Sequence, residues 1–186
     1  SSYQIDYTYQ NLNGQSNDHF INANGTIVNK KKNFGASLFF NSRIRDVYDH
    51  NNDNFSELPS LKNNSIGTNF VYRPKKNQKL ELSLNYLNEY RYGGEQVDSP
   101  ANLALQAEER THHTFLGSAD YQFNFNNYKS SFIVYFANQF TKRDHFTGIR
   151  PDDQEEIEDY IQNPPYGISN TFTINMGSQF NHRVHN

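Results

Sequence analysis

Residues 79–88 read Lys-Leu-Glu-Leu-Ser-Leu-Asn-Tyr-Leu-Asn. Leucine occupies every second position from Leu80 to Leu84, and the polar residues Glu81 and Ser83 stand between the leucines. A period of two places successive side chains on opposite faces of a pleated strand. This stretch therefore predicts a β-strand with one apolar face and one polar face.

The same alternation recurs along the whole chain. Eight strands are predicted, near residues 2–10, 19–28, 34–44, 64–73, 79–90, 111–125, 129–141 and 169–182. Their polar positions carry mostly Asn, Gln, Ser and Thr, which suits a hydrated face. Most of these runs reach the length of about 9–11 residues that a strand needs to cross a bilayer.

The links between the predicted strands fall into two length classes. Short links are expected at 29–33, 74–78 and 126–128, and long loops at 45–63, 91–110 and 142–168. In an up-and-down meander, every second link emerges at the same end of the sheet. Short turns at one rim and long loops at the other are typical of outer-membrane barrels. The pattern predicts an all-β, antiparallel, up-and-down transmembrane barrel whose long loops are extracellular.

Two of the long loops contain stretches that favour a helix. These stretches are residues 101–110 and residues 151–161. The second stretch begins with Pro151 and continues with an acidic first turn, and both features favour a helix start. We therefore expect a short helix in each of these loops.

Composition limits the protein class. The chain has 186 residues and a mean hydropathy of -0.93. No apolar run approaches the roughly 20 residues of a membrane-spanning helix, whereas the polar half of each strand dilutes the hydropathy of a barrel. The lack of cysteine excludes disulfides and cysteine-based sites. A first residue other than Met suggests a processed or truncated product.

Charge is distributed unevenly between the two kinds of link. Lysines at 30–32 lie in a short turn, whereas most carboxylates lie in the three long loops. The net charge of -3 and the scattered basic clusters give little reason to expect nucleic-acid binding. We find neither a Gly-rich phosphate loop nor a nucleophile spaced with its base, so the sequence does not indicate an enzyme.

One acidic loop contains a candidate metal site. Asp46, Asp49, Asn51 and Asp53 supply oxygen ligands in a D-x-N-x-D spacing typical of calcium loops, and Asn54 can take the left-handed turn. The twelfth position from Asp49 is not the bidentate Glu of an EF-hand. A loop that bonds its own backbone explains the same residues.

Further ligands would have to come from elsewhere in the chain. Asp98, in the next long loop, could complete a calcium shell. The adjacent His112 and His113 are expected to point to opposite faces of one strand, so they cannot readily chelate a single ion.

Three segments of the chain resemble a known family. Ser65 to Glu95 contains Ser-Ile-Gly-Thr-Asn-Phe-Val-Tyr-Arg-Pro and then Leu-Glu-Leu-Ser-Leu-Asn-Tyr-Leu-Asn-Glu-Tyr-Arg-Tyr-Gly-Gly-Glu. This run resembles the barrel of TonB-dependent outer-membrane receptors. Glu108 to Tyr121 and Gln139 to Asp144 are similar to the next hairpin of that family, especially in the vitamin B12 and ferric-siderophore receptors. The resemblance covers most of the chain.

The resemblance implies a barrel of about 22 strands, plugged by an N-terminal domain, in the bacterial outer membrane. Such a receptor imports a scarce small-molecule nutrient, here a corrinoid or a ferric siderophore, with energy from TonB. Outer-membrane lipid and a surface lipoprotein are further implied partners, and calcium bound by loop aspartates is familiar in the B12 receptors. Eight strands are about a third of that barrel, and neither a plug, a TonB segment nor a terminal aromatic residue is recognised.

Two alternatives remain open from the sequence. A closed eight-stranded outer-membrane barrel would act as an anchor, an adhesin or a small enzyme. The polar positions read mostly as amides and hydroxyls rather than interleaved Arg, Lys and Glu, which favours an open lumen over a narrow packed tube. A secreted β-sandwich that binds carbohydrate would instead bury Leu80, Leu82 and Leu84 in a protein core.

Overall fold

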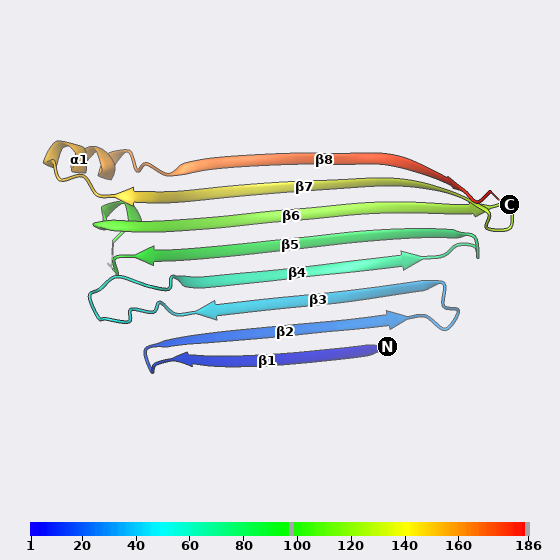
Figure 1. Ribbon diagram of the computed structural model, residues 1–186, viewed down its shortest axis with the longest axis horizontal. Coiled ribbons are helices and arrows are strands. Elements are labelled where there is room, and N and C mark those ends of the chain that lie inside the picture. Colours follow the sequence, from blue (N-terminus) through cyan, green and yellow to red (C-terminus); the bar gives the residue numbers. More distant parts are fainter. Residues whose placement is uncertain (97–98, 185–186) are drawn as a thin grey trace.

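The computed structural model describes residues 1–96 and 99–184. Within this part of the chain, eight antiparallel strands form one sheet, in the order in which they occur in the sequence (Figure 1). The strands are β1 (Ser2–Leu12), β2 (Ser16–Val28), β3 (Phe34–Arg45), β4 (Ser60–Tyr72), β5 (Gln78–Gly94), β6 (Gln106–Phe125), β7 (Ser130–Ile149) and β8 (Gly167–His182). The all-β, antiparallel, up-and-down fold predicted from the sequence is confirmed.

We call the end of the sheet at which the three long loops connect the strands the long-loop rim. Several strands extend further toward this rim than the sequence predicts. β5 continues to Gly94, β6 begins at Gln106 and β7 reaches Ile149. The apolar alternation stops before these positions, where both faces of the strands carry Tyr, Thr, His and charged residues. The loops are therefore shorter than predicted, and the predicted helix at 101–110 is wrong beyond residue 103. Residues 106–110 instead pair with both β5 and β7.

Two short helices lie in the links at this rim. They are η1 (Ala101–Leu103) and α1 (Gln154–Gln162). The carboxylate of Asp153 caps α1, because its Oδ1 accepts the backbone N–H of Glu155 at 2.8 Å and of Glu156 at 3.3 Å. The helix predicted over 151–161 is thus confirmed with a small shift. In the part of the chain that the structure describes, neither helix has the length and apolarity needed to cross a membrane.

The links alternate between the two rims of the sheet. The three long links share one rim with a tight turn between β1 and β2 (Figure 1). This turn holds Asn13 at φ 52° and Gly14 at φ 75°, a left-handed pair that matches the twist of a hairpin. The chain enters β1 and leaves β8 at the opposite, short-turn rim.

One face of the sheet carries a continuous apolar band. The strand registers align the apolar positions of all eight strands, and no second sheet covers them within the described residues. Leu82 and Leu84 are 40% and 46% exposed, and Met176 is 69% exposed. Other members of the band are Ile5, Ile21, Leu38, Phe40, Ile66, Phe115, Val134, Phe136, Phe140, Phe172 and Phe180. This arrangement lacks the core that the sandwich alternative requires.

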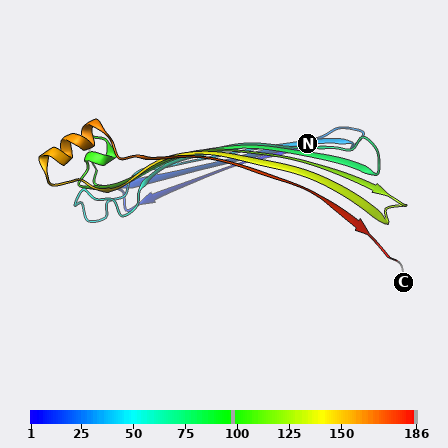
Figure 2. The ribbon, with the colours of Figure 1, turned by 90° about the horizontal axis from the view of Figure 1, so that it is seen from above.

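The opposite face is polar. Pairs of amides and hydroxyls meet across neighbouring strands, as in Asn41 Nδ2 to Ser65 Oγ at 3.1 Å, Thr114 Oγ1 to Thr141 Oγ1 at 3.2 Å, and the bond from Ser83 to the Asn69 side chain. The sheet is twisted and curved along its length (Figure 2).

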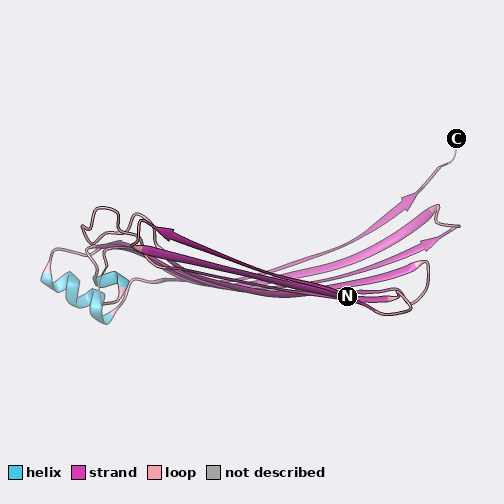
Figure 3. Ribbon diagram, turned by 90° about the horizontal axis from the view of Figure 1, so that it is seen from below, coloured by secondary structure: helices cyan, strands magenta, loops and turns pink. Residues whose placement is uncertain are grey.

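The sheet is open. Among the described residues, β1 pairs only with β2, and β8 only with β7. Strands on the two sides of the sheet diverge toward the short-turn rim (Figure 3). The closed eight-stranded barrel is therefore not the architecture of this chain.

A small core lies on the apolar side at the long-loop rim. Ala101 of η1 and Ala104, which follows this helix, pack against Ala107 of β6 and Phe146 of β7. Tyr92 and Tyr166 pack against this cluster. The links that carry η1 and α1 thus cover the face of β5 to β7 that carries the apolar band, which we call the outer face. They do so where these strands extend past the band toward the long-loop rim. In Figure 2 both helices lie on one side of the sheet and the 46–59 loop on the other.

Gly67 of β4 lies on the polar face, where a larger side chain at this position probes how tightly its neighbours pack. A Cβ built on this residue would overlap the ring of Phe39 and the side-chain oxygen of Asn85. We expect Gly67→Val to lower the free energy of unfolding by about 1–3 kcal/mol, because the ring must leave its place over the glycine. Urea unfolding of the refolded protein measures this change. Gly25→Val is the control, because a Cβ at Gly25 meets only ordinary contacts. Equal losses for both variants would contradict the packing argument.

Candidate functional site

The loop of residues 46–59 engages the side chains of Asp49, Asn51 and Asp53 in local bonds, whereas Asp46 bonds a residue of β2. Asp49 accepts the backbone N–H of Asn52 at 2.8 Å and of Asn54 at 2.9 Å, one on each carboxylate oxygen. Asp53 accepts from the Asn51 side chain at 2.9 Å. Such bonds are those of Asx turns. The two bonds of Asp49 hold the loop to its own backbone.

The remaining predicted ligands do not complete a shell in the structure. Asp46 accepts from Asn17 Nδ2 at 3.0 Å, and Asp98 lies outside the described residues. Across residues 1–96 and 99–184, no three His, Asp or Glu side chains converge as a metal site. Asn54 does adopt the left-handed conformation, at φ 71°. Calcium binding by Asp46, Asp49, Asn51 and Asp53 stays a prediction.

Removing the Asp49 carboxylate should loosen this loop. Asp49→Ala deletes two charge-assisted backbone bonds, so we expect cleavage within residues 46–59 to become about tenfold faster in limited proteolysis. Glu81→Ala, on β5 away from this loop, is the control. Unchanged cleavage of Asp49→Ala would contradict the turn assignment. Protection of the wild type on addition of calcium would support the metal site.

A row of basic side chains crosses the polar face just below the long-loop rim. The strand registers place Arg45 of β3 opposite Leu61, Leu61 opposite Arg91, and Arg91 opposite Arg110. His145 of β7 follows opposite Arg110. We call Arg45, Arg91 and Arg110 the arginine row. Its members come from separate strands that are far apart in the sequence.

A second row lies beside the arginine row on the same face. Its members lie two residues further along each strand, away from the long-loop rim. It runs through Arg43, Asn63, Glu89, His112 and Arg143. Glu89 accepts from Asn63 Nδ2 at 2.9 Å. The two rows together form a belt in which arginines outnumber carboxylates.

Ion pairs neutralise only part of this belt. Arg43 holds Asp18 of β2 through a fork, with Nη2 to Oδ2 at 2.6 Å and Nε to Oδ1 at 3.0 Å. Arg110 pairs with Glu108 at 2.6 Å. Arg45 donates to the backbone carbonyl of Pro59 at 2.9 and 3.1 Å. The bonds of Arg43 and Arg45 anchor the β3 end of the belt and the base of the 46–59 loop.

Several polar atoms of the belt are buried without a partner. They are Nε of Arg110, Nε2 of His112, Nε of Arg143 and Nδ1 of His145. Buried polar atoms are normally hydrogen-bonded. Nitrogen atoms without a partner on adjacent strands are therefore a feature expected of a binding surface.

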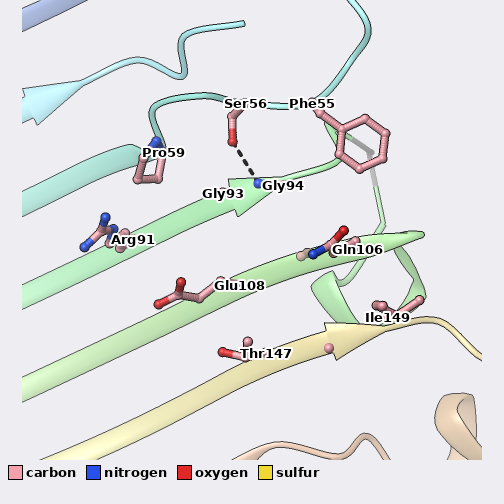
Figure 4. A pocket seen from close by; sticks show the side chains of 12 residues that line it. Phe55, Ser56, Pro59, Arg91, Gly93, Gly94, Gln106, Glu108, Thr147 and Ile149 are labelled. Carbon is pink, nitrogen blue, oxygen red and sulfur yellow. Dashed lines mark hydrogen bonds between the residues drawn. The ribbon is translucent and has the colours of Figure 1, made fainter.

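A pocket of about 610 Å³ opens between the 46–59 loop and the ends of β5, β6 and β7. Arg91, Glu108 and Thr147 contribute polar groups, and Phe55, Pro59 and Ile149 contribute apolar surface (Figure 4). Ser56 Oγ accepts the backbone N–H of Gly94 at 2.8 Å and so fixes the loop above the strands. The pocket is continuous with the arginine row through Arg91.

A carboxylate on the opposite face also gathers partners. Glu109 accepts hydroxyl bonds from Tyr90, at 2.9 Å, and from Tyr166. Burial and the bond to Glu109 raise the pKa of Tyr166, which lies in the link after α1. This cluster fastens the covering links to the strands and does not face the pocket.

The histidines at 112 and 113 point to opposite faces, as predicted. His112 lies in the belt, whereas His113 lies on the outer face and bonds the Tyr86 hydroxyl at 2.9 Å. The expectation that the polar face lacks interleaved Arg and Glu is wrong at the rim. Position parity within β5 and β6 would have shown Arg91 and Arg110 on one face, had the strands been extended beyond residues 90 and 111.

Comparison of the chain with protein-family models and with curated proteins finds no match. The resemblance to TonB-dependent receptors therefore stays a prediction.

Proposed function

We propose that this chain forms part of the wall of a large bacterial outer-membrane barrel, a receptor that imports a scarce nutrient. The observation that carries the proposal is the division of one long antiparallel sheet into an exposed apolar face and a polar face. Lipid would cover the apolar band, and water would fill the lumen beside the amides and hydroxyls.

The dimensions of the band agree with a bilayer. On the apolar face, the stretch from Phe132 to Phe140 of β7 contains one polar residue, Asn138, and is roughly 26 Å long at ~3.3 Å per residue. The stretch from Ile168 to Phe180 of β8 contains two, Asn170 and Ser178, and is roughly 40 Å long. A strand tilt of ~40° reduces these lengths to roughly 20 and 30 Å across the membrane. The apolar band of known barrels, at about 25 Å, lies between them.

The two free edges support a larger barrel. Unpaired backbone groups cost several kcal/mol each in hydrocarbon, so a sheet in lipid has to close on itself. Here β1 and β8 each leave one edge unpaired within the described residues. Further strands would satisfy both edges and leave a wide, hydrated interior. Such an interior suits a transport receptor better than an enzyme or an anchor.

The resemblance in the sequence supplies the remaining detail of the proposal. In a TonB-dependent receptor, a plug domain fills the barrel and TonB supplies energy from the inner membrane. A corrinoid or a ferric siderophore is the nutrient class that the resemblance suggests. A surface lipoprotein above the long-loop rim would be a further partner.

The size of the full gene product in outer-membrane fractions tests the proposal. We expect a heat-modifiable band whose intact mass is several times the 21.7 kDa of this chain. A heat-modifiable product of only this mass would contradict the transport receptor. Recovery in the soluble fraction, with no shift on heating, would contradict a membrane barrel altogether.

A further inference from the structure

We infer that the arginine row and the pocket beside it bind a small molecule that carries two or more oxyanion groups, carboxylates or phosphates. The inference depends on the proposed function only for the role of this ligand as the imported nutrient. Binding itself depends on the geometry of the row.

The arginine row carries positive charge that its neighbours neutralise only in part. Arg91 and Arg110 face each other across adjacent strands, where like charges are destabilising. Among the described residues, Arg91 makes no ion pair, and Glu108 pairs with Arg110 alone. The whole chain has a net charge of -3, so this positive row is not a consequence of composition. An anion bound between the two guanidinium groups would remove the repulsion.

The guanidinium groups of the belt have hydrogen-bond donors that lack an acceptor. A guanidinium group presents a planar fork of donors that matches a carboxylate or a phosphate. Two guanidinium groups on this face already use part of their donors, because Arg43 holds Asp18 in this way and Arg45 donates Nε and Nη2 to the carbonyl of Pro59. Nε of Arg110 and Nε of Arg143 are buried and lack an acceptor. Oxygen acceptors are therefore the groups that this surface is short of.

The pocket beside Arg91 has the size of a small-molecule site. A pocket of about 610 Å³ falls within the range of about 300–1,000 Å³ for small-molecule sites. Arg91 lies in its wall, and Phe55 and Ile149 line it with apolar surface (Figure 4). A ligand in this pocket could thus place an apolar part against the loop and an anionic group on Arg91.

The spacing of the row sets the number of anionic groups. Arg45 and Arg110 are separated by three strand spacings, or about 14 Å at ~4.8 Å each. Arg91 lies between them, directly opposite Arg110. A single carboxylate can bridge Arg91 and Arg110, and a second anionic group is needed to use Arg45. Citrate and pyrophosphate are the simplest probes of the two oxyanion types.

The test uses the full gene product, purified from outer membranes in detergent. We expect isothermal titration calorimetry to show binding of citrate, pyrophosphate or both, and Arg91→Gln to weaken it about tenfold or more. Arg73→Gln, at the short-turn rim, is the matched control and should bind as the wild type does. Preference for citrate would assign a carboxylate ligand, and preference for pyrophosphate a phosphorylated one.

Two results would overturn the inference. One is the absence of binding for both probes at millimolar concentration. The other is equal binding by Arg91→Gln and the wild type. The first result has a recognisable cause if another segment of the protein supplies the counter-charges. In that case neither probe binds, and Arg91→Gln lowers the melting temperature. Heat-modifiable migration of the same samples reports on the barrel independently, so the two proposals can fail separately.

Discussion

Leu82→Arg is expected to lower the free energy of unfolding by about 2–4 kcal/mol in lipid vesicles. Leu82 lies within the apolar band of β5, is 40% exposed, and faces Phe70 and Ala119 on the adjacent strands. If this face meets hydrocarbon, the guanidinium group loses its hydration near the bilayer midplane, and known barrels lose this amount for such a change. Urea unfolding of the full product, refolded in vesicles, measures the loss.

Ser118→Arg is the matched control for this prediction. Ser118 lies one strand away at nearly the same depth, paired with Ser83 on the polar face. In the proposed barrel an arginine there would project into the hydrated lumen, so we expect a change below about 1 kcal/mol. A neutral result for Leu82→Arg would argue against contact with lipid. Equal losses for both variants would indicate that both faces are packed against protein.

The second large effect is expected at the fork between Arg43 and Asp18. Asp18 is only 6% exposed, so Arg43→Met would leave a buried carboxylate without its main partner. Removing one partner of a buried pair costs about 3–5 kcal/mol. Arg43 is 41% exposed and Arg45 lies opposite Asp18, so we expect a smaller loss of about 2–3 kcal/mol. Urea unfolding measures the change.

A double variant separates the lost pair from lost packing. Asp18→Asn combined with Arg43→Met removes both charges, and most of the stability should return because no buried charge remains unpaired. Arg43→Lys keeps the charge without the fork and should fall between the wild type and Arg43→Met. If the double variant is as unstable as Arg43→Met, the charge is not the cause.

The sequence predicted the fold because period-two alternation is a local signal. At Leu80 to Leu84 each apolar residue has polar neighbours on both sides, so the face of every side chain follows from position alone. The short turns carry Asn and Lys residues that accept left-handed backbone, such as Asn126 at φ 51°. These two signals were enough for eight strands in sequence order.

The strand ends at the long-loop rim could not be predicted in the same way. Residues 106–110 contain no apolar alternation, and their pairing with β5 and β7 depends on neighbours that are distant in the sequence. The arginine row depends on the same registers, because Arg45, Arg91 and Arg110 are separated by long loops. Asp49 shows the converse case, in which a local motif for calcium is also a local motif for a closed turn.

The position of the two strand ends has a consequence for how such a protein can change in evolution. β1 begins and β8 ends at the short-turn rim, so the eight strands make an even block of hairpins. Duplicating, deleting or transplanting this block would leave every other strand of a longer sheet running in its original direction. In the proposed barrel, an odd number of strands would invert all that follows and would move its long loops to the periplasmic side. Recombination is therefore expected to preserve this block in whole hairpins.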